Sequence, residues 1–397
     1  MHILIINRYS DDFADYGRYL DHTRHRVSYV TIADHVPMIP PGTGHVEVVE
    51  DVRDADSVVA AASRCHVAAG TLQAVLAPSE FDLLTAALVR EKLGVPGPDT
   101  EATSLFRDKV RMKAALSAEG VRVPRFRAVR SPEDVVAFAA EHPGPVVAKP
   151  RGGAASVGCF IIAEGKDPRR VLAGRDLSDY EVEEFVEGPI WHVDGLRYRG
   201  EDIFTLSSRY LDTCHGFSQG RWLGSAAQGG PEAAAVSRFA ARCLDALGLT
   251  DGPYHLEVIE HRDGLVFLEV GARVGGGEIP FVVRDVYAVD LFADWFRIAL
   301  GEPPAVPPTA AGGAVREYAG FLMLPEPVGS TLLSRTSLLG QIPHLYAEDL
   351  PEPGHVFSGD GGYESILGRF RFRASSPQEV EEAIRRTVDA YRYELSV

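Results

Sequence analysis

The stretch FLEVGARVGGG, residues 267–277, begins as a buried β-strand would and ends as a polar, glycine-rich loop. Its first residues are apolar enough to pack into a core, but Glu269 and Arg273 lie among them and three consecutive glycines follow. Packing alone gives no reason to place a carboxylate, a guanidinium and bare backbone so close together. The end of this strand is therefore a candidate functional site.

A second glutamate lies just before this stretch. Glu257 belongs to YHLEVIE, residues 254–260, and the turn His-Arg-Asp-Gly at 261–264 separates the two apolar runs. Its Asp-Gly pair is typical of an antiparallel hairpin. Two carboxylates on one face of paired strands repel unless a cation lies between them, and such oxygen ligands suit Mg²⁺. The alternative is a solvated sheet face, which the apolar neighbours make less favourable.

Two further segments carry candidate chemistry. PVVAKPRGGAASVGCFII, residues 145–162, places Lys149 on a strand and then a loop of small residues before the next strand. Glycines let backbone N–H groups approach an anion, and the lysine supplies positive charge. The pattern lacks the GK[ST] of a Walker loop and can also be an ordinary turn. In VEEFVEG, residues 182–188, the backbone of a strand end can read an adenine edge between apolar walls.

Composition limits the class of protein. The 397 residues are enough for two or three compact units, and 45% of them are hydrophobic. The net charge of −16 disfavours nucleic acid as a partner. Apolar runs are too short to cross a membrane, and the first residues predict a strand rather than an export signal. Four scattered cysteines indicate reduced thiols and a cytoplasmic protein.

The first hundred residues alternate between strand and helix patterns, which predicts a parallel α/β layer. No GxGxxG turn follows the first strand, so the dinucleotide fingerprint is absent. A single capped helix is predicted next, beginning at Asp99 or Thr100 and ending at Gly120. The expected early strands cover residues 3–7, 27–31, 45–49 and 72–78, and the expected helices cover 55–70 and 80–94.

Short strands dominate the remainder of the chain. Residues 301–313 are rich in Pro, Ala and Gly and predict a linker. The last ~85 residues show another strand pattern and end in a helix with Ser376 as its N-cap. The segment 208–228 is expected to border a substrate pocket.

These segments, in this order, resemble the ATP-grasp superfamily from Lys109 to Gly277. LEVGARVGGGEI and the later AGFLMLPEPVG resemble the branch of L-amino acid ligases and related carboxylate–amine ligases. The resemblance implies an α/β fold with an N-terminal parallel α/β domain, two central ATP-grasp subdomains and a small C-terminal lid domain. The implied boundaries are 1–100, 101–187, 188–305 and 306–397.

The resemblance also implies how ATP is bound. Lys109 and Lys149 would hold the phosphates, and the small-residue loop would close over them. The Glu183 side chain and the hinge backbone after it would bind adenine, and His192 would replace the usual ribose-binding glutamate. The implied ATP-binding residues are Lys109, Lys149, Gly152, Gly153, Ser156, Val157, Gly158, Glu183, Glu184, Phe185, Val186 and His192.

Metal and substrate roles follow from the same resemblance. Glu257 and Glu269 match the carboxylates that bind Mg²⁺, two ions in number, for which Mn²⁺ can substitute. Gly271 stands where many relatives have asparagine, so water is expected to complete a loosely held second ion. Lys149 and Arg273 are the implied catalytic residues, with Arg273 binding the acyl phosphate and the oxyanion. The expected substrate contacts are Arg209, Arg273, Gly275 and Gly276.

The implied activity is ATP-dependent ligation of a carboxylate to an amine through an acyl phosphate, with amino acids as substrates. A homodimer is possible by resemblance, and neither a nucleic acid nor a membrane is an expected partner. Three alternatives stay open: activation of an amino acid for a carrier protein, carboxylation in the manner of biotin carboxylase, and nucleotide binding without catalysis.

Overall fold

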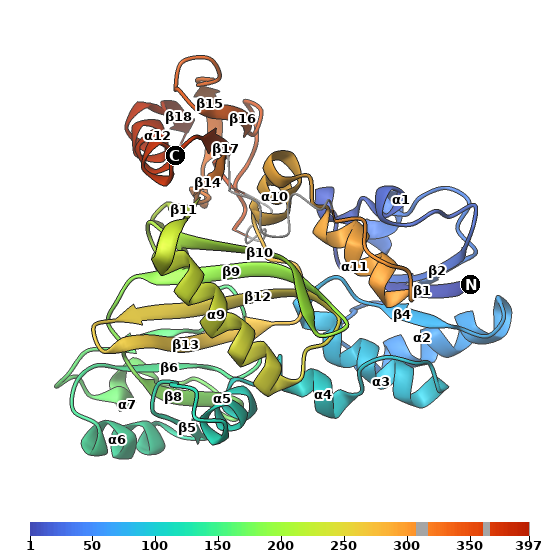
Figure 1. Ribbon diagram of the computed structural model, residues 1–397, viewed down its shortest axis with the longest axis horizontal. Coiled ribbons are helices and arrows are strands. Elements are labelled where there is room, and N and C mark those ends of the chain that lie inside the picture. The colour runs from blue at the N-terminus through green and yellow to red at the C-terminus, as the bar shows by residue number, and fades with distance from the viewer. Residues whose placement is uncertain (307–316, 360–365, 397) are drawn as a thin grey trace.

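The computed structural model describes residues 1–306, 317–359 and 366–396. An N-terminal unit and a small four-stranded unit lie beside one large sheet, to which the C-terminal segment contributes strands (Figure 1). This mixed α/β arrangement confirms the predicted fold class. Within the described residues, no helix combines the length and the apolar character needed to cross a lipid bilayer.

The N-terminal unit is a parallel sheet in the order β3-β2-β1-β4, which confirms the predicted α/β layer. Gly94 ends α3 with a positive φ of 65°, as the helix pattern predicts. Its strands are β1 (His2–Ile6), β2 (Arg26–Thr31), β3 (His45–Val48) and β4 (Ala74–Leu76). Its helices are η1 (Asp12–Ala14), α1 (Tyr16–Tyr19), η2 (Ala33–Met38), α2 (Ala55–Ala68), η3 (Glu80–Asp82) and α3 (Leu83–Leu93).

The helix predicted over residues 99–120 is two helices, α4 (Thr100–Ser104) and α5 (Lys109–Ala118). Asp99 caps α4, as predicted, but Asp108 accepts hydrogen bonds from the first N–H groups of α5 and starts a second helix. This break places Lys109 in the first turn of α5.

The small-residue loop lies in a four-stranded antiparallel sheet with the order β5-β8-β6-β7. It joins β6 to β7, and β8 leads into the predicted adenine hinge. The strands are β5 (Phe126–Val129), β6 (Val146–Pro150), β7 (Phe160–Ile162) and β8 (Tyr180–Glu184), with α6 (Pro132–Glu141) and α7 (Pro168–Val171). Buried side chains of α6, among them Phe138, share one core with these strands and with Leu172, which follows α7.

The large sheet has eight antiparallel strands in the order β13-β12-β9-β10-β11-β14-β17-β16. Helix α9 (Gly230–Leu247) lies across one face (Figure 1). The strands are β9 (Ile190–Tyr198), β10 (Glu201–Tyr210), β11 (Leu223–Ala227), β12 (Gly252–His261), β13 (Gly264–Gly271), β14 (Tyr318–Leu324), β16 (Leu345–Asp349) and β17 (Gly368–Ala374).

The C-terminal segment continues this sheet, because β14 pairs with β11. The predicted boundary at residue 306 therefore separates two parts of one sheet. Ser376 caps α12 (Pro377–Ala390) as predicted, and a small sheet of β15 (Thr331–Arg335) and β18 (Tyr393–Ser396) lies beside it. The part of the predicted linker after residue 306 lies outside the described residues.

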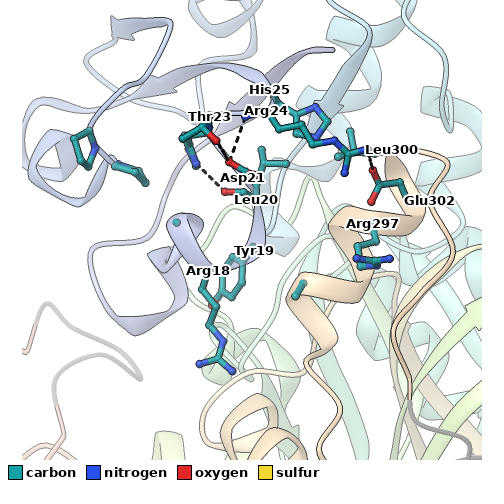
Figure 2. A pocket seen from close by; sticks show the side chains of 15 residues that line it. Arg18, Tyr19, Leu20, Asp21, Thr23, Arg24, His25, Arg297, Leu300 and Glu302 are labelled. Atoms are coloured by element: carbon teal, nitrogen blue, oxygen red, sulfur yellow. Dashed lines mark hydrogen bonds and ion pairs between the residues drawn. The ribbon is translucent and has the colours of Figure 1, made fainter.

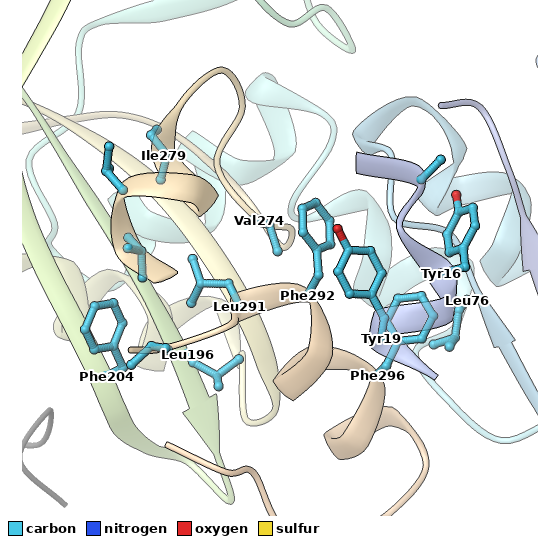
Figure 3. Packing of buried hydrophobic residues seen from close by; sticks show 14 of the residues in the cluster. Tyr16, Tyr19, Leu76, Leu196, Phe204, Val274, Ile279, Leu291, Phe292 and Phe296 are labelled. Atoms are coloured by element: carbon cyan, nitrogen blue, oxygen red, sulfur yellow. The ribbon is translucent and has the colours of Figure 1, made fainter. Parts of the chain in front are cut away.

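An aromatic core joins the N-terminal unit to the segment that follows β13 (Figure 3). Tyr19 stacks on Phe292 with ring centroids 5.1 Å apart, and Phe296 packs against Tyr16 and Tyr19. The two phenylalanines belong to α11 (Leu291–Ala299), which follows α10 (Ile279–Tyr287). Val274 belongs to the same cluster, so this packing fixes the loop after β13 against the N-terminal sheet.

Candidate functional site

The hairpin predicted from the Asp-Gly turn is formed by β12 and β13. Glu257 and Glu269 are direct cross-strand partners, which confirms that they share one face of the sheet. The register shifts between Glu257 and Val258, immediately after this pair. The two carboxylates therefore project side by side.

Both glutamates line a cavity of about 570 Å³. The cavity is bounded by the β12–β13 hairpin, the small-residue loop, the N-terminal unit and the C-terminal segment. Its lining includes Arg8, Glu80, Ala154, Ala155, Ser156, Val157, Tyr210, Cys214, Leu223, His255, Glu257, Glu269, Arg273, Gly276, Glu278, Met323, Arg369 and Arg371. The predicted loop, metal and acyl-phosphate residues thus meet at one place.

The predicted phosphate lysines are paired with carboxylates of the site. Lys149 Nζ lies 2.6 Å from Glu183, and Lys109 Nζ lies 3.1 Å from Glu269. Burial opposes the charge of Lys149, but the carboxylates of Glu183 and Glu181 outweigh it and raise the pKa of the lysine. Burial likewise opposes the charge of Glu269, but Lys109 and Lys149 lower the pKa of that carboxyl to about 2. Both groups are therefore charged at neutral pH.

Lys113, which the sequence analysis does not name, is fully buried beneath these residues. Its ammonium contacts Glu181 at 2.6 Å and also pairs with Glu183. Lys113 follows Lys109 by one helical turn, so the two lysines share one face of α5. The two glutamates are two residues apart on β8, so they share one face of that strand. These spacings are the features of the sequence from which the contact could have been predicted. Both oxygens of Glu183 are engaged by lysines, and its adenine contact stays a prediction.

The predicted adenine hinge begins in the last residues of β8 and continues beyond it. The backbone N–H groups of Glu184 and Phe185 donate to Arg125 and Pro145, so they hold the strand in its sheet. The Glu184 carboxylate accepts from the Arg125 N–H at 3.0 Å. Recognition of a base by the hinge up to Val186 stays a prediction.

The small-residue loop is anchored at its start and presents residues 154–157 to the cavity. The carbonyl of Gly153 accepts a 2.6 Å hydrogen bond from Lys109, and that of Gly152 accepts one from Arg107. Gly158 has a φ of 72°, and a Cβ there would lie 2.8 Å from Tyr180 Oη. Ser156 and Val157 line the cavity as expected, whereas closure over a triphosphate stays a prediction.

Arg273 lines the cavity and is held by a residue that the sequence analysis missed. Its Nε and Nη2 bind the Glu80 carboxylate at 2.7 and 2.6 Å, and its Nη1 donates to the Val274 carbonyl. Burial opposes the charge of Arg273, but Glu80 outweighs it and raises the pKa of the guanidinium. An arginine has five N–H donors, so these contacts leave two for an anion in the cavity.

Two predicted ligand residues lie outside the lining of the cavity. His192 is buried, and its ring nitrogens contact Asp194 at 2.5 Å and Ser225 at 2.6 Å; its ribose contact stays a prediction. Arg209 pairs with Glu381 at 2.8 Å, whereas its neighbour Tyr210 lines the cavity; the substrate contact of Arg209 stays a prediction. Side chains alternate between the two faces along β9 and β10.

The segment 208–228 borders the cavity as expected, through Tyr210, Leu223 and Cys214 of α8 (Cys214–Ser218). This side of the cavity is therefore formed by the end of β10, the short helix α8 and the start of β11.

Three glycines around the hairpin have different surroundings. A Cβ on Gly275 would lie 2.4 Å from Asp194 Oδ1, so the protein itself requires this glycine. Gly276 lines the cavity with open space beside it, and its substrate contact stays a prediction. A Cβ on Gly271 would lie 3.2 Å from Arg273 Cγ. Glycine in place of the asparagine of many relatives therefore leaves space for Arg273 to pair with Glu80.

The donor set fits a divalent cation. Glu257 and Glu269 offer hard oxygen ligands from adjacent strands and open to one cavity. Glu257 is also held by the Tyr210 hydroxyl, which donates to its Oε1 at 3.1 Å.

A second cavity of about 560 Å³ lies between α1 and α11 (Figure 2). Its charges are largely paired, with Arg18 at 2.8 Å from Asp290 and Arg24 at 3.3 Å from Glu302. None of the predicted site residues lines it, so the first cavity is the candidate active site.

No family model matches the chain. An L-arginine-specific L-amino acid ligase from Bacillus subtilis is 25% identical over 386 residues, 93% of this chain and 91% of the relative. The crystal structure of an L-amino acid ligase from Bacillus licheniformis shares the fold, with a TM-score of 0.80, 18% identity and coverage of 100% and 99%.

The biotin carboxylase domain of a Hydrogenobacter thermophilus 2-oxoglutarate carboxylase, solved with MgADP and bicarbonate, has a TM-score of 0.71 and 17% identity over 99% and 90% of the two chains. The sequence match spans nearly the whole chain, and the shared fold brings the paired glutamates to the lysines and the small-residue loop. These similarities in sequence and fold confirm the predicted resemblance to the carboxylate–amine ligase branch of the ATP-grasp superfamily.

Proposed function

We propose that the protein is an ATP-dependent carboxylate–amine ligase that joins amino acids through an amide bond. The observation that carries this proposal is the pairing of Glu257 with Glu269 in the cavity that Arg273 also lines. The similarity to a ligase of L-amino acids supports amino acids as the substrate class.

ATP and Mg²⁺ are the proposed cofactors. Glu257 and Glu269 would hold the metal, as two ions, with Mn²⁺ as a substitute. When bound, the metal would neutralise charge on the triphosphate. Lys109 and Lys149 would release their carboxylate partners in part and turn toward the phosphates.

The reaction has two steps. A substrate carboxylate oxygen bonds to the γ-phosphorus of ATP, and the bond to the bridging oxygen breaks to release ADP. The amine nitrogen then bonds to the acyl carbon, phosphate leaves, and the amine loses a proton. The two remaining donors of Arg273 would stabilise the acyl phosphate and the oxyanion. The loop at residues 154–157 would exclude water, which would hydrolyse the intermediate.

Amide formation between free amino acids is preferred to carboxylation, because the likeness to a biotin carboxylase domain concerns the fold alone. Loading of a carrier protein uses the same first step and differs only in the acceptor. We further propose a cytoplasmic homodimer without nucleic-acid or membrane partners. None of the four cysteines forms a disulfide, which supports the location, and the net charge of −16 supports the absence of nucleic acid.

The test is a screen of amino-acid pairs for ADP formation, with mass detection of the amide product. A ligase releases one ADP and one phosphate for each amide formed. Absence of ATP hydrolysis with every mixture would favour a nucleotide-binding protein without catalysis. ADP release with no amide, restored by a carrier protein, would favour carrier loading.

A further inference from the structure

A row of buried polar side chains lies beside the metal carboxylates on the large sheet. In the pairing of β9 with β12, His255 is opposite Asp194 and Glu257 is opposite His192. Directly opposed residues on antiparallel strands project to the same face. These four side chains therefore form one polar group on that face of the sheet.

Asp194 is the centre of this group and is fully buried. Its Oδ2 lies 2.5 Å from Nδ1 of His192, and its Oδ1 lies 2.8 Å from Nδ1 of His255. Burial by itself would raise the pKa of Asp194, but the charges of His255 and His192 lower it. An ionised carboxylate only accepts hydrogen bonds, so both Nδ1 atoms carry a proton and donate.

The outer ring nitrogens extend the group in two directions. His192 Nε2 lies 2.6 Å from the hydroxyl of Ser225 on β11. His255 Nε2 lies 3.5 Å from Oε1 of Glu257, and His255 lines the active-site cavity. A chain of polar contacts thus runs from β11 through Asp194 to the metal carboxylate.

Glu257 has a second support that also depends on Asp194. The Tyr210 hydroxyl donates to Glu257, and the Tyr210 ring packs on the His192 ring with centroids 4.5 Å apart. The backbone at Gly275 packs directly over Asp194, because a Cβ there would lie 2.4 Å from its Oδ1. Asp194 is thereby confined from the side of the Arg273 loop.

The same three donors, His192, Asp194 and His255, lie within 4.8 Å of one another, which also suggests a metal site. Two ligands of one tetrahedral zinc ion, each ~2.0–2.1 Å from the metal, lie roughly 3.3 Å apart. The contacts of 2.5 and 2.8 Å are shorter than that and have the length of hydrogen bonds. The geometry favours a hydrogen-bonded support.

We propose that Asp194 is a positioning residue for the divalent-ion site: it orients His255 and, through His192, the Tyr210 ring, and these hold the Glu257 carboxylate. The inference rests on the proposed function, because Glu257 acts as a ligand only if the cavity binds a metal and a nucleotide. Outer partners of metal ligands typically change metal affinity about 10-fold to 100-fold when they are removed.

The test measures Mn²⁺ binding by electron paramagnetic resonance in the presence of ADP. Asp194→Asn keeps the shape but presents an N–H group to one imidazole N–H. We expect Mn²⁺ affinity to fall about 10-fold or more. Asp294→Asn is the control, because Asp294 is also buried, at 3% exposure, but lies in α11 away from the site. Its Mn²⁺ affinity should equal that of the wild type.

The outcomes are distinct. Absence of Mn²⁺·ADP binding by the wild type would reject the nucleotide site itself. Wild-type affinity in a folded Asp194→Asn protein, or stoichiometric zinc in the purified protein, would overturn the positioning role alone. If Asp194→Asn does not fold, Ser225→Ala carries the test, because it removes one end of the chain without touching Glu257. Weaker Mn²⁺ binding supports the proposal, and unchanged binding overturns it.

Discussion

Arg273 and Glu80 form an ion pair at 2.6 Å although 193 residues separate them in the sequence. The pair joins the N-terminal unit to the loop that follows the β12–β13 hairpin. Glu80 binds the Nε and Nη2 edge of the Arg273 guanidinium. The orientation of the remaining N–H donors of Arg273 is therefore fixed before a substrate binds. The ion pair therefore pre-orients the arginine for an anion in the cavity.

Replacement of Arg273 by lysine keeps the charge but removes the two-pronged donor. We expect Arg273→Lys to lower kcat about 10²-fold to 10³-fold with little change in the KM for ATP, because the lost contact belongs to the transition state. ADP formation with an active amino-acid pair measures both constants. Arg262→Lys, in the exposed hairpin turn, should behave as the wild type. An unchanged kcat for Arg273→Lys would contradict the assigned role.

The metal carboxylates are tested by neutral isosteres. Glu257→Gln and Glu269→Gln should each raise the Mg²⁺ concentration for half-maximal ADP formation more than about 10-fold, because removal of an outer partner alone can cost that much. Glu201→Gln, exposed at the start of β10, provides a matched control. Wild-type Mg²⁺ dependence in both site variants would show that the carboxylates do not bind the metal.

Substitutions at Gly271 distinguish an effect on the Mg²⁺ requirement from an effect on kcat. Gly271→Asn supplies an oxygen to the second ion and should lower the Mg²⁺ requirement, while crowding of Arg273 should lower kcat. Gly271→Ala makes the same Cβ contact without the oxygen, so it should lower kcat and leave the Mg²⁺ requirement unchanged. If Gly271→Asn also leaves the Mg²⁺ requirement unchanged, water does not occupy a ligand position there.

The small-residue loop can be tested with two glycines of similar backbone. Gly158 and Gly165 have φ values of 72° and 78°, but a Cβ would meet Tyr180 Oη at 2.8 Å only at Gly158. Gly165→Ala should lose about 1–2 kcal/mol of stability from the left-handed conformation. Gly158→Ala should lose that amount and also raise the KM for ATP. Equal KM values for both variants would argue against a nucleotide contact by this loop.

Lys113 is expected to stabilise the fold rather than to contact substrate. Lys113→Met leaves Glu181 without its 2.6 Å partner and should lower the free energy of unfolding by about 3–5 kcal/mol, measured by urea denaturation. Lys166→Met is the control, because Lys166 is exposed and its replacement should change stability by less than about 0.5 kcal/mol. Similar unfolding midpoints for the two variants would show that the buried network contributes little.

Local patterns predicted the elements that carry the site. The Asp-Gly turn sets the register that pairs Glu257 with Glu269, and strand–helix alternation identified the N-terminal layer. The break before α5 was missed because the hydrophobic pattern continues through it, whereas Asp108 offers a second cap. The capping hydrogen bonds of Asp108, rather than the spacing of apolar residues, therefore determine where α5 begins.

The missed contacts are long-range. Nothing near Glu80 in the sequence indicates Arg273 as its partner, because packing of the aromatic core brings them together. The contact of His192 with Asp194 was also not predicted, because the distance of His192 from the hinge does not tell which way its side chain projects from the strand. Side-chain direction on a strand depends on register, which spacing alone does not determine.

The backbone ladder between β11 and β14 has a mechanical consequence for catalysis. Leu223 and Met323 are partners in that ladder, and both line the cavity. Movement of the C-terminal segment away from the cavity would therefore break main-chain hydrogen bonds. We expect the proposed entry of ATP and release of ADP to require a displacement of the four-stranded unit that carries the small-residue loop instead.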